Sequence, residues 1–303
     1  MSCLFLTQVL FAGDFVCNLK TGGRFGEQLQ GYLHAKWLSY KYEIPLLYSP
    51  FSYSTHLRLD DLEIPFDKAP SSHHQLAASN PLPDSSRYTC YLYHEERGFD
   101  PLIFFDVEWK DPKFRKIVLE MIAPKEKLSM IYPPKDALSI AIHVREGGGF
   151  DSDNTRFVIP LKLPPMSYYK EALLKVFALF PNEQFACYLF TDAANPEPIA
   201  EELKSVIPMG MTLEFRKENR HDINVLEDFF SLFNFDILIR SQSQFSLIPS
   251  FLHDYLIDCS PVHFVVENGE PVIDQIQMEI SDEKWHPRRG HFHLSQFPQN
   301  HFQ

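Results

Sequence analysis

The chain has 303 residues, 45% of them apolar and 14% aromatic, which is enough to bury sizeable cores and excludes a disordered chain. This length suits two domains of about 150 residues each. The formal charge of −12 argues against broad binding to nucleic acid or anionic membranes, because both depend on a basic protein surface. An acidic protein can still bind a phosphorylated small molecule, provided that positive side chains cluster at the binding site.

The five cysteines are scattered and form no CxxC pair, which favours reduced, buried thiols in a reducing compartment. No stretch reaches the ~18 uninterrupted apolar residues that a membrane helix requires. The apolar N-terminus also lacks the Lys/Arg-rich region of a signal peptide. We therefore expect a cytoplasmic protein with no transmembrane segment.

The first half opens with an alternation of strand and helix. Residues 14–20 ("DFVCNLK") and 44–51 ("IPLLYSPF") predict strands. Residues 26–43 between them predict an amphipathic helix, whose apolar face carries Leu29, Leu33, Trp37 and Tyr40. This βαβ unit favours a parallel sheet.

The rest of the first half is less regular. Residues 49–100 are rich in Pro, Ser and His and are typical of a functional excursion. Residues 101–109 predict a strand, and 111–124 a helix that begins at Asp111-Pro112. The best boundary between halves is "IYPPKDA". We expect three segments: an N-terminal lobe (1–135), a C-terminal lobe (136–275) and a C-terminal tail (276–303).

The second half alternates more regularly. The expected strands are 137–144, 185–192, 212–218, 236–241 and 263–269, and the expected helices are 165–181, 196–207, 224–235 and 246–256. Such alternation specifies a doubly wound sheet, which binds ligands at the carboxyl ends of its strands.

Four strand ends carry residues suited to a ligand. The first is Gly22-Gly23-Arg24-Phe25-Gly26, which is neither a dinucleotide fingerprint nor a P-loop. Its glycines allow a sugar or phosphate to approach the backbone, and the helix that follows favours an anion. A plain tight turn before the helix is the alternative.

The second strand end is "HVREGGG", residues 143–149. Alternation along the strand puts the preceding isoleucines on one face and His143 and Arg145 on the other. Arginine suits a diphosphate because its guanidinium presents donors in a fixed fork. A surface salt bridge and a core histidine are the alternative.

The third and fourth strand ends are weaker signals. Asp192 ends a strand, where its carboxylate can accept hydrogen bonds from a guanine edge or cap the next helix. Ser241, Ser243 and Ser246 surround a helix start that suits phosphate, with Phe245 wedged in the turn.

Taken in order, the GGxxG turn, the HxR strand end, the Thr-Asp strand end and the SxFS helix start resemble the fucosyltransferase superfamily. "HVREGGGFD" is closest to its NodZ-like variant, and the helix with Asp228 resembles the family's helix before the last motif. The resemblance covers residues 16–48 and 138–255. It implies an α/β fold of GT-B type, in which the parallel sheets of two Rossmann-like lobes face a central cleft.

The resemblance also implies an activity: inverting, metal-independent transfer of fucose from GDP-fucose to a glycan hydroxyl, with no cofactor besides this donor. Arg145 would hold the β-phosphate, His143 would contact the ribose-phosphate or position Arg145, and Asp192 would read guanine. The donor site would be completed by Gly147, Gly148, Ser243, Phe245 and Ser246. The acceptor side would be lined by Gly22, Gly23 and Arg24.

An inverting transfer needs a base for the acceptor hydroxyl. Several family members place an acidic residue shortly after HxR, whereas this chain has Glu146 followed by glycines. Glu146, Asp151 and Asp153 are the candidates, with Glu146 preferred and Asp151 next.

Two other interpretations compete. Asp151 and Asp153 form a DxD sequence, which in GT-A enzymes holds a metal ion bridged to the diphosphate. A non-catalytic nucleotide-binding protein of the same fold is the third interpretation. The expected partners are a nucleotide sugar and a glycan, at a membrane periphery if the glycan is built there, and no nucleic acid.

Overall fold

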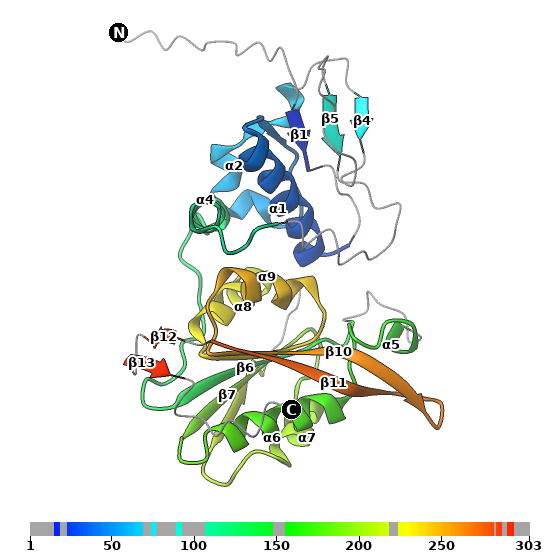
Figure 1. The fold of residues 1–303 in the computed structure, drawn as a ribbon, viewed down its shortest axis with the longest axis vertical. Coiled ribbons are helices and arrows are strands. Elements are labelled where there is room, and N and C mark those ends of the chain that lie inside the picture. The colour runs from blue at the N-terminus through cyan, green and yellow to red at the C-terminus, as the bar shows by residue number, and fades with distance from the viewer. Residues whose placement is uncertain are drawn as a thin grey trace. The chain divides into compact units, whose positions relative to one another are not determined.

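A computed structural model of the chain describes residues 15–18, 23–68, 74–76, 89–92, 107–147, 155–217, 224–281, 283–286 and 290–293. The chain forms two compact units, Met1–Lys127 and Leu128–Gln303 (Figure 1). Each unit combines helices with a sheet of mostly parallel strands, which confirms the predicted α/β class. The division lies before the predicted boundary at 135/136, and the functional assignment of the two domains stays a prediction.

The described strands of the first unit form a parallel sheet in the order β3-β2-β1-β5-β4. Their bounds are β1 (Phe15–Cys17), β2 (Leu46–Tyr48), β3 (Ile64–Pro65), β4 (His74–Leu76) and β5 (Thr89–Leu92). Since β1 and β2 are parallel neighbours joined through a helix, the predicted βαβ unit is confirmed. The segment 49–100 is more regular than predicted, because it supplies three of these strands.

The described helices of the first unit are α1 (Phe25–Tyr42), η1 (Ser54–His56), α2 (Leu59–Leu62), η2 (Phe66–Lys68) and α4 (Pro112–Ile122). The two predicted helices of the first unit, α1 and α4, begin and end close to the predicted positions, whereas η1, α2 and η2 lie in the segment 49–100 that was predicted to be irregular. Helix α1 buries the predicted Leu29, Leu33 and Trp37, and Asp111 caps α4 by accepting from the amides of Lys113 and Phe114 at 2.8 and 3.2 Å. Residues 107–109 form no strand, and 101–106 lie outside the described residues.

The six-stranded sheet described in the second unit has the order β11-β10-β9-β6-β7-β8. Its strands are β6 (Leu138–Val144), β7 (Phe185–Thr191), β8 (Thr212–Phe215), β9 (Ile237–Arg240), β10 (Ile257–Glu267) and β11 (Glu270–Ile280). All pairs are parallel except β10 with β11. The order places β6 at the centre of the sheet, where its carboxyl end has strand neighbours on both sides.

Helices cover both faces of this sheet (Figure 1). They are α5 (Thr155–Val158), α6 (Met166–Leu179), α7 (Glu197–Lys204), α8 (Val225–Ser231), η3 (Leu232–Asn234) and α9 (Gln244–Leu252). Helices α6 and α7 share one apolar cluster with Ile140 and Ile142 of β6. The other face carries a second cluster, in which Ala141 of β6 packs with Leu232 of η3. Residues of both faces are buried, so β6 is mostly apolar and is interrupted only by Ser139 and His143.

The antiparallel hairpin β10–β11 corrects the predicted C-terminal end. The sequence predicts a final strand at 263–269 and a tail from 276, whereas β10 begins at Ile257 and β11 reaches Ile280. Asn268 and Gly269 form its turn with φ of 53° and 85°, as a two-residue hairpin turn requires. The "NG" signal was present in the sequence and was missed. Beyond it, β12 (Glu283–His286) pairs with β13 (Gly290–His293).

Candidate functional site

The carboxyl end of β6 carries the predicted His-x-Arg pair. Strand alternation turns Val144 toward α6 and α7, and His143 toward α8 and α9. The His143 ring is 5% exposed, and its centroid lies 5.3 Å from that of Phe245, in the first turn of α9. Phe245 also packs edge-on against Phe229 of α8, with the ring centroids 5.7 Å apart. The HxR and SxFS motifs are therefore in direct contact.

Arg145 continues from β6 and lies beside the end of β7. The two strands pair in parallel with Val144 opposite Thr191, so the next residues, Arg145 and Asp192, are neighbours. Arg145 is 8% exposed, and its Nη1 atom lies 3.8 Å from Oδ2 of Asp192. The other carboxylate oxygen of Asp192 accepts from the Glu146 amide at 2.6 Å. Asp192 thus fixes the backbone at Glu146 through a hydrogen bond and places a negative charge beside the Arg145 guanidinium.

These contacts bear on the two interpretations of Asp192. Helix α7 begins at Glu197 and has Pro196 at its N-cap, so helix capping by Asp192 is wrong. Guanine recognition by Asp192 stays a prediction. The side chain of Glu146, the preferred base, is exposed, and Gly147 is buried with a φ of 92° that favours glycine. Gly148, Asp151 and Asp153 lie outside the described residues.

Helix α9 begins at Gln244 and ends at Leu252, whereas the sequence predicted a helix over 246–256. Ser243 is the N-cap residue, and its carbonyl accepts from the amides of Ser246 and Leu247 at 3.1 and 2.9 Å. The Ser243 and Ser246 side chains are both buried. The first turn of a helix directs N–H groups and a partial positive charge outward, which suits a phosphate oxygen. This turn follows β9, whose register pairs Arg240 with His143 of β6.

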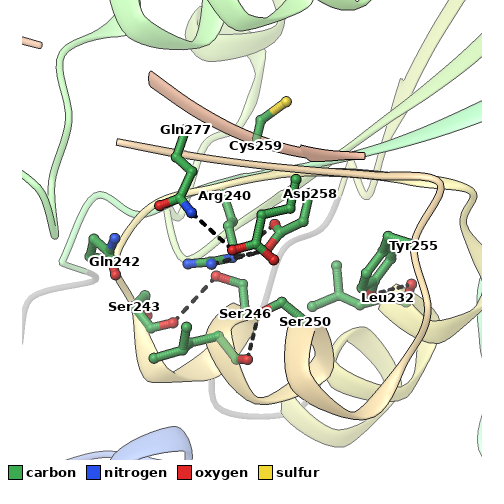
Figure 2. A network of polar contacts seen from close by, with 12 residues as sticks. Leu232, Arg240, Gln242, Ser243, Ser246, Ser250, Tyr255, Asp258, Cys259 and Gln277 are labelled. Atoms are coloured by element: carbon green, nitrogen blue, oxygen red, sulfur yellow. Dashed lines mark hydrogen bonds and ion pairs between the residues drawn. The ribbon is translucent and has the colours of Figure 1, made fainter. Parts of the chain in front are cut away.

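A buried ion pair lies at this same strand end, and sequence reasoning missed it. Arg240 donates to both oxygens of Asp258 on β10, from Nε at 2.9 and 3.1 Å and from Nη2 at 3.0 Å. Figure 2 draws this pair together with Ser243 and Ser246 of α9. Burial lowers the pKa of Arg240, but the facing carboxylate outweighs it and the net pKa is raised, so the guanidinium stays charged. The sequence did carry a signal for this ion pair, because Arg240 ends an otherwise apolar strand.

The backbone around the ion pair is held by side-chain hydrogen bonds. Tyr168 of α6 donates to the carbonyls of Arg240 and Cys259 at 2.7 and 3.1 Å, which ties β9 to β10. Gln242 donates from Nε2 to the carbonyl of Pro261 at 2.9 Å. These hydrogen bonds therefore fix the backbone at Arg240 and Gln242 without a bound ligand.

A second charged group lies near the end of β8. Arg216 contacts Asp228 of α8 at 2.8 Å from Nε and Glu227 at 3.3 Å from Nη2. Burial raises the pKa of Asp228 to about 6, against the lowering effect of Arg216. Asp228 lies on the helix that the sequence predicts, whereas its contact with Arg216 was not predicted.

The glycine-rich turn of the first unit precedes α1 as predicted, and Gly22 lies outside the described residues. Gly23 has a φ of 76°, and a side chain there would collide with Glu27. The Arg24 carbonyl accepts from the amides of Glu27 and Gln28 at 3.0 and 3.1 Å. Nearby, Asn18 at the end of β1 exchanges two hydrogen bonds with the backbone of Ser49, at 2.8 and 2.9 Å. Local packing thus accounts for the glycine, and its predicted acceptor role stays a prediction.

Two further findings concern metals and membranes. Among the described residues, no group of three or more His, Cys, Asp or Glu side chains is placed to hold a metal ion. The described helices also include none that is both long and apolar enough to cross a membrane. Cys17, Cys187 and Cys259 are buried thiols that are not joined in disulfides, and burial raises the pKa of the Cys187 thiol to about 12.

No family model matches the sequence, and no curated protein matches it either. Among solved structures, a mutant of FUT1 from Arabidopsis thaliana in complex with GDP is similar to this chain, with a TM-score of 0.55 and 13% sequence identity. The match covers 88% of this chain and 73% of that chain.

Two other solved structures match with lower scores. Fucosyltransferase NodZ from Bradyrhizobium has a TM-score of 0.46 and 13% identity, over 88% of this chain and 98% of that one. POFUT1 in complex with GDP-fucose has a TM-score of 0.41 and 10% identity, over 80% and 94%. The similarity to FUT1 gives the chain the GT-B fold. This confirms the resemblance at the level of the fold.

Proposed function

We propose that the protein is a glycosyltransferase that transfers fucose from GDP-fucose to a glycan hydroxyl, with inversion and without a metal ion. One observation carries the proposal: the buried guanidinium of Arg145 ends the central strand next to the strand that leads into α9. A positive side chain and a helix N-terminus at neighbouring strand ends suit the two phosphates of a nucleoside diphosphate. The fucosyltransferase-like fold supports the class of reaction, and the choice of donor is ours.

The proposed chemistry follows from these donors. The acceptor oxygen forms a bond to C1 of fucose from the face opposite the diphosphate, and the bond from C1 to the β-phosphate oxygen breaks. Negative charge then grows on the departing GDP. Arg145 and the first turn of α9 stabilise this charge, since preoriented donors act most strongly where charge develops. Asp192 keeps Arg145 in place, and Phe245 supports His143 beside it.

The proton of the acceptor hydroxyl needs a base, and we propose Glu146, with Asp151 as the second candidate. Glu146 is exposed, so its carboxylate can be reached by a ligand that approaches from solvent. The variants Glu146→Gln and Asp151→Asn separate the two. The variant that removes the base should lower kcat by about 10²- to 10⁴-fold without changing the affinity for GDP.

The donor is tested with a thermal-shift panel of GDP, UDP, CMP and ADP. Binding to the folded state alone raises Tm, so GDP should raise Tm above the shifts from the other three. Arg145→Ala should abolish this shift. Arg58→Ala is the matched control, because Arg58 is an exposed arginine of the first unit paired with Glu120. An equal response to all four nucleotides would reject guanine specificity.

Activity is tested by hydrolysis of GDP-fucose and by transfer to a panel of glycans. Turnover that persists in EDTA agrees with the metal-independent route, and loss of turnover that Mn²⁺ restores would favour the Asp151/Asp153 interpretation. Selective GDP binding without any turnover would favour the non-catalytic interpretation. The cytoplasmic location and the acceptor stay predictions from the sequence.

A further inference from the structure

The loop that follows β2 places two aromatic side chains at the carboxyl edge of the first unit's sheet. Phe51 and Tyr53 come shortly after this strand, and both are partly exposed. Helix α1 begins at the same edge, because it follows β1, which runs parallel to β2. Ligands of parallel sheets bind at this edge. The aromatic loop, residues 49–54, is therefore in a position where a ligand is expected.

Hydrogen bonds hold the aromatic loop in one conformation. Its start is joined to β1 by the two bonds between Asn18 and Ser49. The Ser54 hydroxyl donates to the Phe51 carbonyl at 2.7 Å and accepts from the Phe51 amide at 2.8 Å. The Phe51 ring also packs against Tyr32 of α1, with the ring centroids 6.0 Å apart. Because the loop is ordered in advance, a ligand that binds to it loses little affinity to ordering.

Tyr53 adopts a backbone conformation that is unfavourable for a tyrosine. Its φ of 63° lies in the left-handed region, where a bulky side chain is strained and a glycine is not. Strained residues of this kind cluster at ligand sites. The Tyr53 ring meets the buried Phe25 ring edge-on, with the centroids 6.0 Å apart and the planes at 88°. This contact fixes the orientation of the Tyr53 ring, and part of its surface stays exposed to solvent.

Gln28 of α1 adds a polar group at the aromatic loop. Its Oε1 atom accepts from the Ser52 amide at 2.9 Å, and its Nε2 atom donates to the Gly23 carbonyl at 3.2 Å. A side-chain amide has two N–H donors, and its oxygen accepts two hydrogen bonds. Within the described part of the chain, Gln28 thus keeps one donor and one acceptor for a ligand. Its side chain is partly exposed, so a ligand can reach them.

We infer that Tyr53 and Gln28 bind one pyranose ring of the glycan acceptor. A pyranose presents C–H groups on its faces, which pack against an aromatic ring, and hydroxyls around its rim, which both donate and accept hydrogen bonds. An aromatic surface with a few fixed polar groups is typical of small-molecule sites. The inference rests on the proposed function, because it takes the ligand of the first unit to be the acceptor glycan.

The test uses three neutral probes, the linear β-linked tetrasaccharides of glucose, galactose and mannose, with the whole chain. Saturation-transfer NMR identifies the sugar protons that contact the protein, and calorimetry gives Kd. At least one probe should bind, with the strongest saturation on the C–H protons of a ring face. Circular dichroism checks that each variant is folded.

Tyr53→Gly removes the ring and suits the left-handed backbone, so the variant should fold and its Kd for the bound probe should rise about 10-fold or more. Tyr53→Phe keeps the ring and should keep the wild-type Kd. Gln28→Ala should raise Kd by about 5-fold, the value of one hydrogen bond. Tyr42→Ala is the matched control, because Tyr42 is 45% exposed and ends α1 at the opposite edge of the sheet. Its Kd should be unchanged.

An unchanged Kd in Tyr53→Gly would overturn the inference, and so would an equal loss of affinity in Tyr42→Ala. The thermal shift with GDP, measured on the same protein, separates this inference from the proposed donor. Wild-type protein that binds GDP and none of the three probes would overturn the inference alone. Wild-type protein that binds a probe through Tyr53 and does not bind GDP would reject the donor and support the inference. Binding of neither would overturn both.

Discussion

The two faces of the second unit's sheet differ in chemistry although the same strands build both. The face beneath α6 and α7 is apolar from Leu138 to Val144, and the polar atoms of Tyr169 and Ser241 appear only at its carboxyl end. The face beneath α8 and α9 carries His143 and Arg240 among its apolar residues. Side-chain alternation separates the two sets with a period of two. One strand can therefore stabilise the fold on one side and bind a ligand on the other.

In both units the first strand leads through a helix into a parallel neighbouring strand, but the described residues that end these two strands differ in charge. The strand end of β1 carries Asn18, whose amide is used to join β1 to β2. The corresponding strand end of β6 carries Arg145, held by an aspartate and next to a helix start. Shared topology thus supplies an edge where a ligand can bind, and charged side chains at that edge decide whether an anion is favoured.

The largest expected effect comes from breaking the Arg240–Asp258 pair on the charged face. Removing one partner leaves the other charge buried, which costs about 3–5 kcal/mol. Arg240→Met should lower the free energy of unfolding by that amount, measured in urea. The double variant Arg240→Met/Asp258→Leu should recover most of the loss, because no buried charge remains. A double variant as unstable as the single one would show that packing, and not charge, dominates at this position.

A somewhat smaller effect is expected from the acidity of Asp228. Its pKa rises from 3.8 to about 6 on folding, so the folded protein binds the proton more tightly than the unfolded chain. This contribution to stability is complete below pH 3.8 and is lost as pH rises through 6, on the order of 3 kcal/mol. Asp228→Asn should remove this dependence from Tm measured between pH 4 and 7. Glu227→Gln, which alters the other carboxylate that contacts Arg216, is the control and should retain it.

The smallest expected effect comes from Ile142→Val, which should change stability without changing affinity for GDP. Ile142 directly precedes His143 but packs on the α6 side. Ile142→Val removes one methylene group and should lower the free energy of unfolding by about 1 kcal/mol. Affinity for GDP, measured by calorimetry, should stay the same, because the altered side chain faces away from the candidate site. A loss of affinity for GDP in Ile142→Val would mean that packing on the apolar face affects the ligand site.

Much of the fold was predictable because its signals are local. The strand and helix alternation of 137–256, the opposite facing of Ile142 and His143, and the Asp111 cap all follow from residue spacing over a few positions. Two errors also had local signals: the Asn268-Gly269 turn marks the missed hairpin, and Ile276, Met278 and Ile280 alternate along β11. The short strands within 49–100 had weaker signals, because two to four residues are too few to show a period.

By itself, the sequence determined which residues stand at the strand ends: His143, Arg145, Asp192 and the serines around α9. Only the tertiary structure decided how they are used. Strand order put Asp258 opposite Arg240, parallel register turned Asp192 toward Arg145, and helix packing brought Phe245 against His143. The physical reason is that spacing along one segment fixes which face a side chain occupies, whereas its partner depends on which distant segment the core packs beside it.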